Sequence, residues 1–295
     1  MEYEIKELRK SLYYAPCHNF GDELNKHLFE KVFNVKFSYC ENIWSADYIA
    51  IGSVLGWACV QSSQFDIKTT LGLLYDFLKG PRKYGKLTVL GSGFLNCPEK
   101  YKLNFLRKMD YKILRGKLTE NYLHQNNHLK NDVLLGDLGL LCSYITSGKI
   151  NKKYTLGIIP HYIDLNSPIF YDIYKKYDSK CIIINVQDDV DKIITQINEC
   201  ETIISTSLHG LIVSDSFNIP NLWVENTLKY GRDDYFKYRD YYSIYNMEKH
   251  YPVSLLDFIN KDPYFILDSY KIKKDEIQKK KNELFDYCYK HFNNI

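Results

Sequence analysis

The stretch ETIISTSLHGLIVSDSF, residues 201–217, carries the clearest structural signal in the chain. Its segment 202–205, with Ile203 and Ile204 at the centre, is typical of a buried strand, and the apolar positions of 211–217 predict a helix. The residues between them include hydroxyls, an imidazole and a glycine, which suit a tight turn before a helix. The stretch therefore predicts a β-strand that leads into an α-helix, the repeating unit of a parallel sheet covered by helices.

The same alternation continues on both sides of this stretch. In the second half of the chain we expect strands at 154–159, 181–186, 202–205 and 221–225, and helices at 169–177, 190–200 and 211–217. Apolar residues at helical spacing predict a further long helix over about 272–292, whereas 264–268 is left unassigned. In the first half we expect strands at 11–15, 35–40, 48–52, 86–90, 111–114 and 133–135, and helices at 21–33, at 69–78 and from 117 onward.

The polar segment ITSGKINKK, residues 145–153, separates the two series and is interpreted as a linker. We therefore predict the α/β class, with two Rossmann-like, doubly wound parallel-sheet domains facing a cleft. The expected boundaries are an N-terminal domain at 1–147, a second domain at 153–268, and a C-terminal helix at 270–295.

Composition restricts the function classes and the compartment. A net charge of only +3 over 295 residues argues against a nucleic-acid-binding protein. The eight cysteines form no CxxC pair, so we expect reduced thiols in protein cores, as in a cytoplasmic protein. The start, MEYEIKELRK, is too polar for a signal peptide, and no stretch approaches the roughly 18 apolar residues of a membrane span. Two basic clusters, 79–86 and 271–281, add the expectation of peripheral contact with the inner face of the membrane, although the second is interpreted first as the exposed face of a helix.

Ligands of open α/β sheets bind beyond the carboxyl ends of the strands, so polar turns that follow strands are the candidate sites. The strongest candidate is the turn of Ser207, Leu208, His209 and Gly210. Hydroxyls, an imidazole and a helix N-terminus together suit an oxyanion or a phosphate. Helix capping alone explains a hydroxyl at Thr206 or Ser207. An imidazole is not needed for capping, which makes His209 the better functional candidate.

A second candidate turn is PCHNFGDELN, residues 16–25, which follows the first expected strand. Gly21 permits a tight turn, and the N–H groups at the start of the helix favour an anion or a hydroxyl. Asp22 has the chemistry to accept a proton from a sugar hydroxyl. The alternative is that Asn19 or Asp22 only caps the helix.

Three further turns complete the candidate set. Ser92 and Gly93 lie in a GSGF turn, where the incomplete GxGxxG pattern argues against a nicotinamide site and favours a backbone loop that lines the cleft. Arg115 ends a strand and could grip a carboxylate or phosphate, or else lie on the surface and pair with Glu120 or Asp137. His161 also ends a strand, where it could hold a phosphate, transfer a proton or simply pack.

The order of these motifs resembles the polysaccharide pyruvyltransferase family. The resemblance rests on NFGDELN, GSGF, the Arg115–Gly116 turn, GDLGLL, IIPHY, STSLHGLIVSDSFNIPNLW and FKYRDYY, which span about Asn19 to Tyr242. It implies a GT-B-like fold, phosphoenolpyruvate as the donor, a saccharide acceptor that is expected to be lipid-linked, and a product used in a capsule or exopolysaccharide. It also implies that Arg115 and His209 bind the donor and that Asp22 lies near the reacting hydroxyls, with His209 and Asp22 as catalytic candidates.

The chain departs from the family pattern at one position. Many relatives have an arginine two residues before the histidine, where this chain has Ser207. His161, Lys229 or Arg232 could supply the positive charge instead. No set of metal ligands is evident, and we expect no cofactor apart from phosphoenolpyruvate as a co-substrate. The rival interpretations are a GT-B glycosyltransferase that uses a nucleotide sugar and a non-catalytic carbohydrate-binding protein.

Overall fold

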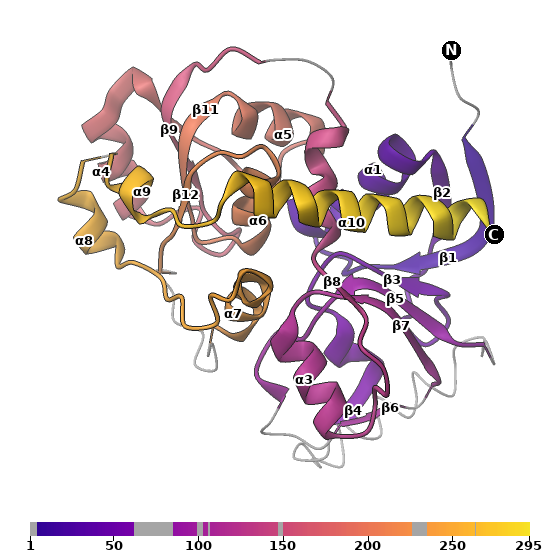
Figure 1. Ribbon diagram of the computed structural model, residues 1–295. Coiled ribbons are helices and arrows are strands. Elements are labelled where there is room, and N and C mark those ends of the chain that lie inside the picture. The colour runs from indigo at the N-terminus through magenta and orange to yellow at the C-terminus, as the bar shows by residue number, and fades with distance from the viewer. Residues whose placement is uncertain are drawn as a thin grey trace. The chain divides into compact units, whose positions relative to one another are not determined.

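The computed structural model describes residues 5–61, 85–98, 103–105, 107–146, 150–225, 235–262 and 264–295. The chain forms two compact units, each built around a parallel sheet (Figure 1). Unit 1 comprises Met1–Cys17, Phe29–Leu138 and Asp233–Glu248, and unit 2 comprises His18–Leu28, Gly139–Arg232 and Lys249–Ile295. The predicted class, α/β with parallel sheets in two Rossmann-like bodies, is confirmed, whereas the GT-B-like arrangement and the domain boundaries stay predictions.

Unit 1 contains a six-stranded sheet in which every pair of neighbouring strands is parallel. Its spatial order is β2 (Val35–Tyr39), β1 (Lys6–Tyr13), β3 (Tyr48–Ile49), β5 (Leu87–Ser92), β7 (Met109–Leu114) and β8 (Leu134–Leu135). The short strands β4 (Cys59–Gln61) and β6 (Leu103–Phe105) pair antiparallel. The helices are the last turn of α1 (Phe20–Phe33), α3 (Lys117–Gln125) and α7 (Phe236–Tyr242). Apolar side chains of the sheet, including Ile49, Val89 and Leu114, form the core with Leu123 of α3.

Unit 2 contains a four-stranded parallel sheet. Its spatial order is β10 (Cys181–Ile183), β9 (Tyr154–Ile159), β11 (Cys200–Ser205) and β12 (Asn221–Trp223). The helices are the first turns of α1, then α4 (Pro168–Tyr177), α5 (Val190–Asn198), α6 (Leu208–Ser216), α8 (Leu255–Ile259), α9 (Tyr264–Ser269) and α10 (Lys274–Asn293). The strand β9 and the helices α4 and α8 share one apolar core, with Ile158, Phe170 and Phe258 at its centre.

Most of the predicted elements are present, and their ends differ for physical reasons. The helix expected to begin at Leu211 begins at Leu208, so that His209 and Gly210 lie in its first turn. A Cβ on Gly210 would come within 2.5 Å of Ser205 Oγ and 2.9 Å of Ile159 Cγ2, so the close packing of this helical turn on the strands requires glycine. The first strand runs Lys6–Tyr13 instead of 11–15, because backbone pairing with β2 includes charged residues that an apolar pattern does not detect.

Several expectations fall where the structure gives no description. The predicted helix at 69–78, most of the basic cluster at 79–86, and both Lys229 and Arg232 lie outside the described residues. The unassigned residues 264–268 belong to helix α9.

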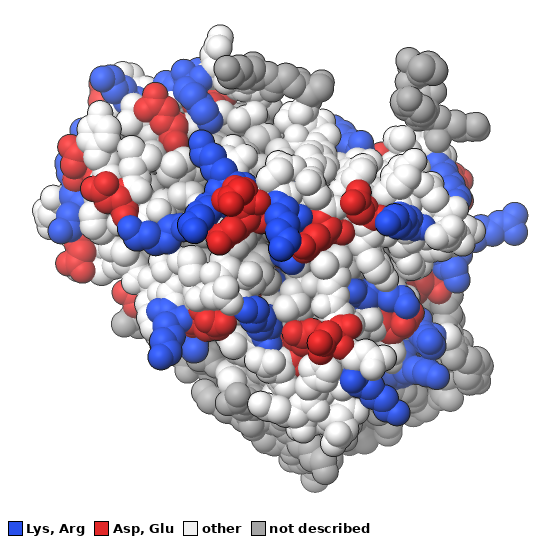
Figure 2. Space-filling model, in the orientation of Figure 1, with Lys and Arg blue, Asp and Glu red and all other residues white. Residues whose placement is uncertain are grey.

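The long helix α10 confirms the helix expected over about 272–292 and the interpretation of its basic run as an exposed face. Ile277 and Leu284 are buried, whereas most of the lysines and acidic residues around them are not. Lys281 is the exception, because its Nζ is buried and donates to Ser143 Oγ and to the carbonyl oxygen of Ser216. Figure 2 shows basic and acidic side chains interspersed over the face it draws. Among the described helices, none has the length and apolar character needed to cross a membrane.

The cysteines are all free thiols, as expected for a chain without disulfides. Five of them are buried, at positions 59, 142, 181, 200 and 288. The expectation of core thiols is wrong for Cys17, which is exposed, and only half true for Cys40 and Cys97, which are partly buried.

Candidate active site

The candidate site lies at the carboxyl edge of the unit 2 sheet. The strand β9, first of this sheet in the sequence, has β10 on one side and β11 on the other. Successive strands are therefore added first on one side of β9 and then on the other, so a topological switch point lies between β9 and β11. Ligands of open α/β sheets bind at such a switch point. His161 follows β9, and the turn from Thr206 to Gly210 follows β11. Ser205 and Ile159, the last residues of the two strands, lie opposite each other in register.

Hydrogen bonds connect the turns that follow these two strands. The backbone N–H of His161 donates to Thr206 Oγ1 at 2.8 Å, and Thr206 Oγ1 in turn donates to Asp164 Oδ2 at 2.9 Å. Asp164 is 1% exposed, so its carboxylate is buried, and the hydrogen bond that it accepts from Thr206 stabilises the turn. The network holds His161 beside the turn that carries His209. Sequence reasoning missed Asp164, although a carboxylate in the turn just after His161 was a detectable signal.

Ser205 and Ser207 fix the backbone at the N-terminus of α6. Ser207 occupies the N-cap position with extended backbone, and its side chain makes no capping hydrogen bond. Its own N–H donates to Ser205 Oγ at 2.9 Å. Ser207 is thus the N-cap residue of α6, but the alternative that its hydroxyl serves as a side-chain cap is not borne out. The first-turn N–H groups and the helix dipole favour an anion at this end of α6.

His209 in this first turn lies directly over Gly21 of α1. A Cβ on residue 21 would overlap Nδ1 of the imidazole and would lie 2.7 Å from its Cγ and Cε1. Carbon atoms without a covalent bond pack at about 3.5–4.0 Å, so only glycine leaves room for the ring. Both residues belong to unit 2. The structure thus brings the NFGD and SLHG motifs, which are far apart in the sequence, into one site.

The NFGD segment is attached to the unit 2 sheet beyond β10. The N–H of Phe20 donates to the carbonyl oxygen of Val186 at 2.8 Å, and Gln187 Nε2 donates to the carbonyl oxygen of His18 at 3.2 Å. Asn19 Nδ2 donates to Asp22 Oδ2 at 3.1 Å, which orients the Asp22 carboxylate. The Asn19 amide nitrogen therefore orients Asp22, while the carbonyl oxygen of Asn19 accepts from the N–H groups of Asp22 and Glu23 at the start of α1. Both residues stay candidates for the site.

His18, in the same segment, is an additional cationic group that sequence reasoning did not single out. Its Nδ1 lies 2.6 Å from Glu23 Oε1. The hydrogen bond to the Glu23 carboxylate raises the pKa of His18, and so does the negative charge of Glu23. The imidazolium thus persists to higher pH than in a free histidine, as the partner of the Glu23 carboxylate.

The remaining sequence candidates, Ser92, Gly93 and Arg115, belong to unit 1 and form a cluster there. Arg115 is 0% exposed, so the alternative of a surface arginine is wrong, and its carboxylate partner is Asp240 instead of Glu120 or Asp137. Its Nε donates to Asp240 Oδ2 at 3.0 Å, its Nη1 to Ser53 Oγ at 2.6 Å and its Nη2 to the carbonyl oxygen of Phe94. A donor-binding role for Arg115 stays a prediction.

Asp240 comes from the FKYRDYY motif, and it is fully buried. Its Oδ1 accepts from the N–H of Thr119 at 2.9 Å and its Oδ2 from Thr119 Oγ1 at 2.7 Å. A Cβ on Gly93 would lie 2.7 Å from Asp240 Oδ2 and from Arg115 Cζ, so the backbone of the GSGF turn packs directly against this ion pair. The FKYRDYY motif was recognised in the sequence, but the sequence did not show that its Asp240 is the counter-ion of Arg115.

Comparison with known proteins agrees with these motifs. Residues 19–227 match the sequence model of a family described as polysaccharide pyruvyl transferase. A protein of Acanthamoeba polyphaga mimivirus, named "Uncharacterized protein L143", is 30% identical over 244 residues, which is 80% of this chain and 74% of that protein. The matched region includes both motifs of the candidate site, NFGD and SLHG.

Proposed function

Because the chain belongs to the polysaccharide pyruvyl transferase family, we propose that it transfers a pyruvyl group from phosphoenolpyruvate to a sugar of a surface polysaccharide precursor and forms a cyclic ketal. The observation that carries the proposal is the His209 imidazole packed on Gly21 at the switch point of the unit 2 sheet. An imidazole and a carboxylate from two separate motifs are thereby gathered at a helix N-terminus.

The chemistry of the donor suits this site. Phosphoenolpyruvate carries a phosphate and a carboxylate, and the N-terminus of α6 favours a negative group. In the proposal the phosphate lies there, with His209 in the first turn and His161 on the adjacent strand end as its cationic partners. His161 takes over the charge that relatives with an arginine at the position of Ser207 would supply. The roles of Leu208 and Gly210 are then to line the site with backbone groups.

The reaction balances with one acid and one base. A proton is added to the methylene carbon of phosphoenolpyruvate, which leaves a cationic centre at C2. One sugar hydroxyl adds to C2, phosphate leaves, and a second hydroxyl closes the ketal. Of the two hydroxyl protons, one replaces the proton given to the methylene carbon and the other leaves on the phosphate. We assign the proton delivery to His209 and the removal of hydroxyl protons to Asp22, whose carboxylate is oriented by Asn19.

The proposal includes a place of action. The acceptor is a lipid-linked saccharide, and the protein works in the cytoplasm at the inner face of the membrane without a spanning helix among the described residues. A vesicle flotation experiment with and without the saccharide lipid measures this association.

The direct test is phosphate release from phosphoenolpyruvate over a panel of saccharide acceptors. We expect release that depends on the acceptor, and a melting temperature that rises with phosphoenolpyruvate and not with UDP- or GDP-sugars. The variant His209→Gln should lose about a hundredfold or more in turnover, the usual scale for a general acid or base, and keep its melting temperature. The matched control is His27→Gln, since His27 lies on α1 and faces Asp191 at 3.7 Å. A melting shift with nucleotide sugars alone would replace this proposal by the glycosyltransferase.

A further inference from the structure

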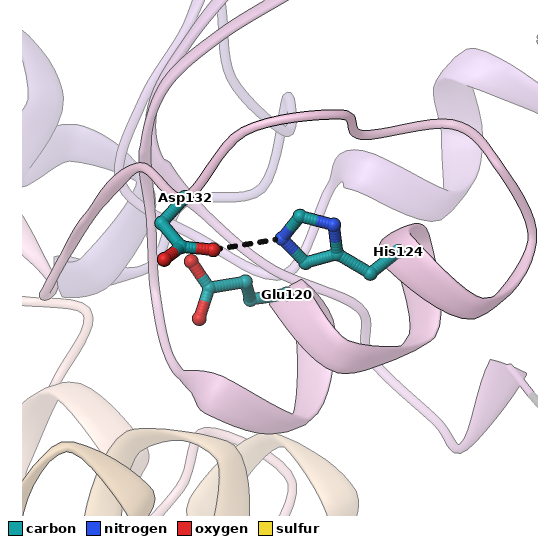
Figure 3. A group of neighbouring side chains, drawn as sticks. All are labelled: Glu120, His124 and Asp132. Atoms are coloured by element: carbon teal, nitrogen blue, oxygen red, sulfur yellow. Dashed lines mark ion pairs between the residues drawn. The ribbon is translucent and has the colours of Figure 1, made fainter.

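A second cluster of chemically active side chains lies in unit 1, on the helix that follows the Arg115–Gly116 turn. Glu120 and His124 are one helical turn apart on α3, and Asp132 lies in the segment that joins α3 to β8. Residues four apart on a helix present their side chains on the same face. Figure 3 shows the two carboxylates and the imidazole turned toward one another.

The distances within this cluster match those in a metal site. One ligand atom from each residue lies within 4.8 Å of the other two, and His124 Nε2 is 3.3 Å from Asp132 Oδ1. Metal–ligand distances of about 2.0–2.2 Å for imidazole nitrogen and carboxylate oxygen place neighbouring tetrahedral ligands roughly 3.3–3.5 Å apart. The His124–Asp132 edge already has this length. Closing the site requires Glu120 to move by on the order of 1 Å, which a flexible side chain permits.

The charge of the cluster calls for a cation. Two carboxylates face each other, and none of the described lysines or arginines lies within ion-pair distance of Glu120 or Asp132. Repulsion between like charges makes such a pair unfavourable without a positive partner. Protonation of His124 would supply one charge, whereas a divalent cation would neutralise both carboxylates.

An independent observation concerns the imidazole nitrogen itself. His124 Nε2 is shielded from solvent and makes no hydrogen bond of good geometry, its approach to Asp132 Oδ1 being 3.3 Å, although the side chain as a whole is 30% exposed. A buried polar nitrogen ordinarily has a hydrogen-bond partner, because an unsatisfied one is costly. This nitrogen faces the Asp132 carboxylate with the Glu120 carboxylate beside it, an arrangement that suits a metal ligand (Figure 3).

We propose that Glu120, His124 and Asp132 bind a divalent transition metal of the zinc class. One imidazole with two carboxylates suits Zn²⁺ better than Mg²⁺, which prefers oxygen ligands alone. Asp132 is 96% exposed, so water can complete the coordination. The ion fixes the segment before β8 to the middle of α3, where Glu120 Oε1 already accepts from the N–H of Val133 at 3.3 Å. The site is structural, since none of these residues belongs to the candidate active site.

The test is a zinc titration of the full chain, followed by calorimetry and thermal unfolding. Asp132→Asn changes an exposed side chain and leaves folding intact, and Glu120→Gln and His124→Ala remove the other two ligands. We expect the wild type to bind one Zn²⁺ more than each variant, or to bind it at least tenfold more tightly. We also expect its melting temperature to rise by a few degrees at a hundredfold excess over the Kd, with no rise in Mg²⁺.

The matched control is His27→Ala, whose imidazole is 26% exposed and also faces one carboxylate, that of Asp191. This variant should bind zinc like the wild type. The proposal is overturned if Asp132→Asn and Glu120→Gln bind zinc with wild-type stoichiometry and affinity, because the metal would then be held by other residues. An equal or larger response to Mg²⁺ than to Zn²⁺ would equally contradict it.

Discussion

The substitution Gly21→Ala tests the contact on which the candidate site depends. The change adds one methyl group at the start of α1, where the His209 ring occupies the space of a Cβ. Alanine is more favourable than glycine in a helix by about 1 kcal/mol, so the backbone of α1 should accept it. The perturbation is therefore confined to the position of the imidazole.

The magnitude follows from the distances. The new Cβ would lie 2.7 Å from Cγ and Cε1 of the ring, and it would overlap Nδ1. Restoring an ordinary contact of about 3.5 Å requires the ring to retreat by roughly 1 Å. A displacement of that size in a catalytic group costs about a hundredfold in rate. We therefore expect turnover in Gly21→Ala to fall about a hundredfold while the melting temperature changes by only a few degrees.

The assay is phosphate release from phosphoenolpyruvate with an active acceptor, next to thermal unfolding of the same preparations. Gly85→Ala is the matched control, because a Cβ at Gly85 would meet nothing within 4 Å. It should behave like the wild type in both measurements. The double variant Gly21→Ala/His209→Gln should be no slower than His209→Gln alone, since both changes act through the same imidazole.

Two results would refute this reasoning. Turnover in Gly21→Ala within a few fold of the wild type would show that the ring position over residue 21 does not matter for the reaction. Additive losses in the double variant would show that Gly21 acts through a group other than His209.

Two further predictions concern stability and reactivity. Asp240→Asn leaves the buried Arg115 guanidinium without its counter-ion and should lower the free energy of unfolding, measured in urea, by about 3–5 kcal/mol. The control Asp110→Asn, at a partly exposed ion pair, should lower it by less than about 1 kcal/mol. A loss below about 1 kcal/mol for Asp240→Asn would mean that the buried pair is not needed for stability. With iodoacetamide at pH 8, Cys17 should be alkylated first, as mass spectrometry of timed samples would show. Burial raises the pKa of four other thiols to about 12 and lowers their thiolate fraction, so early labelling of any of them in the native protein would contradict their burial: Cys59, Cys181, Cys200 and Cys288.

The periodic pattern of apolar residues was sufficient to predict the class of fold and most of its elements. Strands such as 154–159 are apolar runs of the right length, and helices such as α4 and α5 repeat their apolar residues with the helical period. These properties are local, because they depend on neighbouring residues and on the geometry of one element. The order of the motifs was also visible in the sequence and was enough to indicate the family that the comparison confirms.

The sequence by itself therefore determined the strand–helix units and the chemical groups at their ends, since both are fixed by local patterns. Only the tertiary structure decided which of those groups meet. It packed His209 on Gly21, placed His161 beside Thr206, and buried Arg115 against Asp240. These contacts join residues that are remote along the chain, and they follow from strand order and close packing, which no single segment encodes. The need for glycine at position 210 was decided in the same way, by the little space that Ser205 and Ile159 leave beside it.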